Sequence, residues 1–181
     1  MKNYTLTGGL ILGFLGILIT GITYFIGINA MISLWTALIV FVLFTALYIF
    51  MGLRYRKMNG GFLVFKEAFA LIFFMSVIST VLSGIFMIIL YHVINPELPG
   101  KLQDAVIQKS AAMMQSFGLQ QDKIDEQISK MQADPNDFTV GKQIRGIAIS
   151  FVWSAAVAAI IGLIIRKNPP PFENTPDQIQ A

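Results

Sequence analysis

No Lys, Arg, Asp or Glu occurs in the stretch that decides the fold, NYTLTGGLILGFLGILITGITYFIGINAMISLWTALIVFVLFTALYIFMGL (residues 3–53). One membrane-spanning helix needs about 20 apolar residues, so this stretch is long enough for two spans and a tight connection. The sequence Gly27-Ile-Asn-Ala30 suits the connection because Gly and Asn turn the chain readily. We therefore predict spans at about residues 8–28 and 31–53.

Two further charge-free stretches predict two more spans. They run from Ala68 to Pro96 and from Gly146 to Ile165, and they place spans at about residues 68–93 and 146–165. Backbone groups in lipid must find hydrogen-bond partners within the segment, so each span is expected to be a helix. The runs are too long and continuous for the alternating strands of a barrel. The predicted fold is an all-α membrane protein, with one four-span domain over residues 1–167.

The composition supports a membrane protein and excludes several other classes. Of the 181 residues, 55% are hydrophobic and 13% are charged, whereas soluble domains carry about 25% charged residues. The balance is opposite to that of a disordered chain. The net charge of +3 is too small to imply binding to nucleic acid. The chain has no Cys and one His, His92, so it can form neither a thiolate metal site nor a multi-histidine one. We expect no metal and no cofactor.

The two ends of the chain carry separate expectations. The first span could instead be a signal peptide cleaved after the small residues Ile28-Asn-Ala30. Its single Lys2 and its long apolar run favour a retained helix instead. At the other end, residues 168–181 contain a Pro169-Pro170-Pro171 run and are predicted to be a disordered cytoplasmic tail.

Basic residues predict the orientation, because cytoplasmic loops of membrane proteins are enriched in Lys and Arg. Seven basic residues lie in the N-terminus, in the loop after the second span and in the C-terminal tail: Lys2, Arg54, Arg56, Lys57, Lys66, Arg166 and Lys167. The segment between the third and fourth spans, residues 94–143, is long and mixed in charge. We therefore predict that both termini are cytoplasmic, in the inner membrane of a bacterium.

The external segment is predicted to be a helical hairpin. Pro96 ends the third span, because proline lacks the amide that a continuing helix would use. Apolar residues at helical spacing then predict one helix over residues 101–117, stopped by Gly118, and a second over residues 122–132. Asp134-Pro-Asn-Asp137 ends the second helix. The hairpin either caps the bundle or offers a surface to a partner.

Small residues line up along two of the spans, where they let helix backbones approach closely in lipid. The first span carries Gly9, Gly13 and Gly16. The fourth carries a row with a spacing of four: Gly146, Ser150, Ser154, Ala158 and Gly162. The rows either close the bundle itself, or one of them, on the fourth span, docks another integral membrane protein. The second span is bulkier and is the best candidate for lipid exposure.

Few residues within the spans could carry chemistry, and we predict no catalytic residue. Glu67 and His92 lie at opposite ends of the third span, about 38 Å apart along a helix, so they cannot share a site. Hydroxyls on the same span could line a narrow polar path, or could bond to carbonyls of their own helix: Ser76, Ser79, Thr80 and Ser83.

The basic loop after the second span is the most distinctive local sequence. Arg54, Arg56 and Lys57 lie close together, before the turn at Asn59-Gly-Gly61. Cations beside a membrane attract anionic phospholipid headgroups. They either set the topology alone or also contact lipid headgroups or a partner.

The order of these elements resembles the domain-of-unknown-function 4199 family over nearly the whole chain. The shared features are the basic Tyr55-Arg56 loop, the Gly60-Gly61 turn, Phe65-Lys-Glu-Ala-Phe69, the exit Ile94-Asn-Pro-Glu-Leu98, the amphipathic external segment and the ending Ile164-Ile-Arg-Lys167. The resemblance implies a bacterial four-helix protein of the inner membrane. It supplies no catalytic residues.

Three functions follow from these observations. The lack of chemical groups and the rows of small residues favour a non-enzymatic accessory or scaffold protein that packs with or regulates another membrane protein. The alternatives are a small oligomeric transporter or channel, and an enzyme of lipid or glycan metabolism whose site a partner completes. The expected partners are the bilayer with its anionic phospholipid headgroups, and either another integral membrane protein or a second copy of this chain. We expect no nucleic-acid partner.

Overall fold

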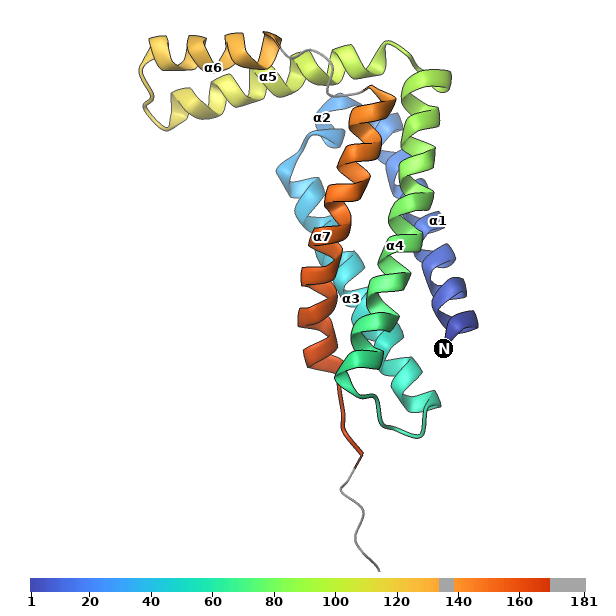
Figure 1. Ribbon diagram of the computed structural model, residues 1–181. Coiled ribbons are helices and arrows are strands. Elements are labelled where there is room, and N and C mark those ends of the chain that lie inside the picture. The colour runs from blue at the N-terminus through green and yellow to red at the C-terminus, as the bar shows by residue number, and fades with distance from the viewer. Residues whose placement is uncertain (134–138, 170–181) are drawn as a thin grey trace, which may run out of the picture.

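The structure, a computed structural model, describes residues 1–133 and 139–169 and is helical throughout most of this part (Figure 1). The helices are α1 Lys2–Ile26, α2 Ile28–Met31, α3 Leu34–Met58, α4 Phe65–Ile89, the π-helix η1 Leu90–Ile94, α5 Leu98–Ser116, α6 Gln121–Ala133 and α7 Val140–Ile165. The described residues form no strand, and their only β-type pairing is an isolated bridge between Leu63 and Lys167. The predicted break at 134–137, and all of the predicted tail except residues 168 and 169, lie outside the described residues.

Four of these helices are long and apolar enough to cross a membrane: Lys2–Ile26, Leu34–Met58, Phe65–Ile94 and Val140–Ile165. The predicted all-α fold with four spans is confirmed. Each helix extends past the apolar stretch from which it was predicted, because polar residues such as Arg56 and Lys142 continue the same helical backbone. Figure 1 shows the four long helices side by side, with the N-terminus and the end of α7 at the same end of the bundle.

Helix α4 is the centre of the bundle, with α1 and α7 packed along it. Six α4 residues are buried, whereas α3 buries only Tyr48 and Gly52. The outward side chains of α3 include Trp35, which is 74% exposed. As its bulky composition predicted, α3 is the least buried of the four spans.

The half of the bundle that contains the two ends of the described chain has a continuous apolar core. Its fully buried members on the spans come from α1, α4 and α7: Leu12, Ala68, Leu71, Ile72, Met75, Ala158, Ile161 and Ile165. Leu63, from the loop before α4, is buried with them. This core closes the bundle at that end.

The connection between the first two spans differs from a simple tight turn. Gly27 has φ +122, a backbone conformation that L side chains rarely adopt, and it ends α1. Ile28–Met31 then forms the short helix α2 before α3 begins. Gly27 is therefore the turn residue expected from the sequence, and Asn29 belongs to a helix instead.

At the other end of the bundle, the third span closes with a π-helix and leads into α5. The span ends at Ile94, before Pro96, and α5 begins at Leu98. A second buried cluster anchors the start of α5 to this end: Leu90, Tyr91, Leu98 and Leu102.

Helices α5 and α6 project sideways from the bundle and lie next to each other (Figure 1). Gln103 donates a side-chain hydrogen bond to the carbonyl of Met131, and Ile124 is buried. On the solvent face of α6, a hydrogen bond from Lys130 lowers the pKa of the Glu126 carboxyl. The side of the membrane on which this pair lies stays a prediction.

Candidate functional site

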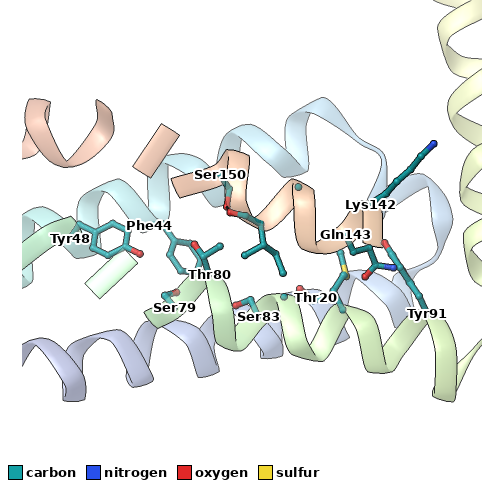
Figure 2. A pocket seen from close by; sticks show the side chains of 14 residues that line it. Thr20, Phe44, Tyr48, Ser79, Thr80, Ser83, Tyr91, Lys142, Gln143 and Ser150 are labelled. Carbon is teal, nitrogen blue, oxygen red and sulfur yellow. The ribbon is translucent and has the colours of Figure 1, made fainter. Parts of the chain in front are cut away.

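A cavity of about 560 Å³ lies among the four spans, in the half of the bundle nearer to α5. Its walls come from α1, α3, α4, η1 and α7, and Figure 2 shows its side chains. Seven of them carry a hydroxyl: Thr20, Tyr48, Ser79, Thr80, Ser83, Tyr91 and Ser150. The volume is typical of small-molecule sites, which measure about 300–1,000 Å³.

The small residues of α7 pack against α4 near the end of the helix and line the cavity near its start. Near the end of α7, Ala158 is fully buried, and a Cβ on Gly162 would lie 3.3 Å from the backbone nitrogen of Phe69 on α4. Near its start, a Cβ on Gly146 would meet nothing within 4 Å. Gly146 and Ser150 line the cavity instead of a helix contact.

The cavity extends along the outer part of α4 and stops at the apolar core. Its lining on the third span runs from Ser79 to Tyr91, which is about 18 Å of helix. Met75, one turn before Ser79, is fully buried in the core cluster. The core thus forms a floor.

Several cavity hydroxyls already donate their hydrogen to the protein. Thr20 donates to the carbonyl of Gly16 at 2.9 Å, and Ser150 donates to the carbonyl of Ile147 at 2.6 Å, each within its own helix. Ser83 donates across helices to the carbonyl of Gly13 on α1 at 3.3 Å.

The lining offers hydrogen bonding rather than acid–base chemistry. No carboxylate or imidazole is present among the described residues that line the cavity, and residues 1–133 and 139–169 contain no group of three potential metal ligands. Lys142 lines the mouth through its stem, and its ammonium points away from the cavity (Figure 2). Gln143 and Tyr91 lie close together at the same end.

The hydroxyls singled out on the third span divide between the cavity and the core. Ser79, Thr80 and Ser83 line the cavity. Ser76 is buried and donates to the carbonyl of Phe73 in its own helix. Glu67 and His92 are exposed near the two ends of the span and do not meet.

The glycine row on α1 lies against α4. A Cβ on Gly9 would lie 2.7 Å from Cβ of Ile78, and one on Gly13 would lie 3.2 Å from Cα of Ser79. One on Gly16 would lie 2.5 Å from Oγ of Ser83. On α7, Ser154 is half-buried between the cavity part of the row and its packed part.

The three cations of the basic loop have different surroundings. Arg56 donates from Nη1 to the carbonyl of Ile165 at 2.9 Å and so ties the end of α3 to the end of α7. Arg54 and Lys57 are exposed. Nearby, Lys167 lies 5.6 Å from the centroid of the Phe62 ring.

Several cavity residues were not singled out from the sequence. Phe44 and Tyr48 come from the bulky second span, where nothing distinguishes an inward aromatic residue from those that face lipid. On α7, the polar or small residues Gln143, Gly146 and Ser150 recur every three or four positions, which is a helical signal. Only Gly146 and Ser150 belonged to the row that the sequence indicated.

Comparison with known proteins gives a family and no function. No curated protein and no solved structure matches the chain. A family model described as "Protein of unknown function (DUF4199)" matches residues 7–167, which include most of the first span, the other three spans, the cavity lining and the α5–α6 pair. The chain therefore belongs to the DUF4199 family, as its loop and helix-end motifs suggested.

Proposed function

We propose that this protein is a non-enzymatic integral membrane accessory protein that holds a guest molecule in the cavity between its spans. The observation that carries the proposal is the lining itself. Hydroxyls, one amide and apolar side chains line about 560 Å³ among the spans, and no described lining residue is a general base or a nucleophile with a base beside it. Such a surface binds and orients a molecule.

The accessory role is supported by the surface that the bundle leaves uncovered. Gly9, Gly13 and Gly16 pack against α4, so the α1 row serves the bundle itself. Helix α3 gives only two buried residues to the interior. Its exposed large side chains, such as Leu34, Trp35 and Ile39, are available to lipid and to a neighbouring membrane protein. We place the partner on this side, with guest binding in the cavity altering the position of α3.

The proposed location is the inner membrane of a bacterium, with both termini in the cytoplasm. The exposed Arg54 and Lys57 support this orientation, because they belong to the last part of α3, which lies beside the start of α1 through the hydrogen bond from Tyr4 to the Met51 carbonyl. At that surface they are placed to meet anionic phospholipid headgroups.

The test is extraction from the native membrane in a mild detergent, followed by mass spectrometry of everything that travels with the chain. Gly146→Leu fills the cavity from a position with open space around it, whereas Gly141→Leu makes the same change on the same helix outside the cavity. A guest present with wild type and Gly141→Leu, and lost with Gly146→Leu, supports the proposal. An unchanged set of molecules from all three proteins contradicts it.

A second candidate is a small transporter or channel, favoured by the hydroxyls of Ser79, Thr80 and Ser83 along one wall of the cavity. Transport through the bundle would require the apolar floor around Met75 and Leu71 to open. Flux of ions or small solutes into liposomes that contain the purified protein favours this candidate. If no flux is measured at high protein density, the transporter candidate is rejected and the accessory role remains.

A further inference from the structure

The cavity hydroxyls define the kind of hydrogen bond that a guest can make. A Ser or Thr hydroxyl has one hydrogen to donate and two lone pairs that accept. Thr20, Ser83 and Ser150 donate that hydrogen to backbone carbonyls. These three oxygens therefore offer lone pairs to the cavity, and a guest group that matches them is a hydrogen-bond donor.

The same walls do not favour a charged guest at depth. A cation buried in the spans needs a counter-charge, and no described lining residue is acidic. An anion would face the lone pairs of Ser83 and Ser150, and the ammonium of Lys142 points away from the cavity. The part of the guest that enters is therefore uncharged.

The remaining lining is apolar and elongated. Phe44, Met87 and Ile147 contribute side chains. Gly146 leaves open space beside α7, whereas the Ile147 side chain lies directly against Gly84 of α4. The lining spans about 18 Å along the third span, so an extended chain fits better than a compact ring system.

We propose, on the basis of the binding function proposed above, that the cavity is a site for an uncharged single-chain amphiphile whose polar group is a hydrogen-bond donor, an alcohol or an amide N–H. The chain lies along α4, and the donor meets the oxygen of Ser83 or that of Ser150. Among lipids of a membrane, this selects chains that end in a hydroxyl or amide over carboxylates, quaternary amines and esters.

The test uses the full-length protein in phosphatidylcholine nanodiscs, with thermal unfolding followed as probe is added. A ligand that binds only the folded state raises the midpoint with its concentration. The probes are 1-dodecanol and its methyl ether, which keeps the chain and the oxygen and loses the donor. We expect the alcohol to raise the midpoint at concentrations about three- to tenfold lower than the ether, the size of one hydrogen bond. Equal effects of the two probes overturn the proposed ligand class.

Two serine variants locate the contact. Ser150→Ala removes a cavity oxygen and should reduce the preference for the alcohol over the ether. Ser116→Ala is the matched control, because Ser116 also donates to the carbonyl three residues before it, at Met113, but lies on α5 outside the cavity. A preference that survives Ser150→Ala, Ser83→Ala and the double variant overturns the proposed contact.

Gly146→Leu separates this inference from the proposed function. If wild type binds the alcohol and the ether equally and Gly146→Leu binds neither, the cavity is still a binding site, but the proposed preference for a hydrogen-bond donor is rejected. Alcohol binding that Gly146→Leu does not change rejects the cavity as the site, and the proposed function is contradicted with it.

Discussion

Glycine serves two structural purposes within α1, and each position shows which one applies. At Gly9 and Gly13 the α4 backbone and side chains come so close that a Cβ would overlap them. At Gly21 a Cβ would meet nothing within 4 Å, although Gly21 lies on the same helix. Helix spacing shows that such glycines lie on related faces, but only the packed structure shows which of them is in contact.

We predict opposite effects of alanine at two of these positions. Gly9→Ala forces α1 and α4 apart and should lower the free energy of unfolding by about 1–3 kcal/mol. Gly21→Ala should leave stability unchanged or raise it by about 0.5–1 kcal/mol, because alanine favours the helix. Unfolding in mixed micelles with increasing SDS measures both. Equal destabilisation by the two variants would show that the α1–α4 contact is misplaced.

Arg56 should matter more to stability than its neighbour in the basic loop. Arg56→Ala removes the hydrogen bond to the Ile165 carbonyl, a contact with a charged donor that is typically worth about 1.5–3 kcal/mol. Lys57→Ala changes an exposed side chain and should be nearly silent. The same SDS titration compares them. If Lys57→Ala proves as harmful as Arg56→Ala, the tie between α3 and α7 is not a stabilising contact.

At the scale of single helices, the α7 row shows why a pattern of small residues does not give one outcome along its length. The members of this row have a regular spacing in the sequence, but only those near the end of α7 pack against α4. Ala158 and Gly162 are buried, and Gly146 faces open space.

Leucine substitutions along this row should therefore differ sharply. Gly162→Leu must displace the backbone at Phe69 and should destabilise the monomer by about 1–3 kcal/mol or more. Gly146→Leu has room in the cavity and should leave the unfolding transition close to wild type. A large loss of stability for Gly146→Leu, measured in the same detergent, would mean that the outer halves of α4 and α7 are also closed.

The α5–α6 pair should behave as a unit that is separate from the spans. Ile124→Ala removes a buried side chain from α6 and should increase amide exchange in α6 and along the part of α5 beside it. Such a core truncation typically costs about 2–5 kcal/mol locally. Exchange in α1, α4 and α7 should not change. Faster exchange across the spans would show that the pair holds the bundle together.

The spans could be predicted from the sequence because the bilayer needs long charge-free runs, and these stand out on their own. The helix ends were harder to predict, because polar residues such as Lys2 and Arg56 lie on the same continuous helices. The π-helix Leu90–Ile94 left no signal that we could use. Three of the four hydroxyls suspected on the third span line the cavity, but the inward aromatic residues of α3 depend on helix rotation, which bulky apolar sequences do not specify.

Taken as a whole molecule, the bundle is packed at one end and hollow at the other. The apolar core joins α1, α4 and α7 near the two ends of the described chain, while residues of α1, α3, α7 and the outer part of α4 line the cavity. Within that half, Ile147 of α7 still lies against Gly84 of α4. The apolar core and the proposed binding site therefore lie in different halves. Changes in the hollow half can alter binding without unfolding the protein.

The orientation of the whole molecule can be tested directly because the chain has no cysteine. Lys123→Cys places a thiol on α6, and Lys57→Cys places one at the opposite end of the bundle; both positions are exposed. In intact cells, a membrane-impermeant maleimide should label Lys123→Cys and reach Lys57→Cys only after lysis. The reverse pattern would place both termini outside the cytoplasm.

The central claim is that the outer half of the bundle holds a guest, and an experimental structure in nanodiscs formed from native-membrane lipids tests it most directly. We predict elongated density along α4 between Ser79 and Tyr91, present in wild type and in Gly141→Leu and absent in Gly146→Leu. Helices α3, α4 and α7 closed on one another in wild type, with Phe44 filling the space and no density between them, would contradict the account.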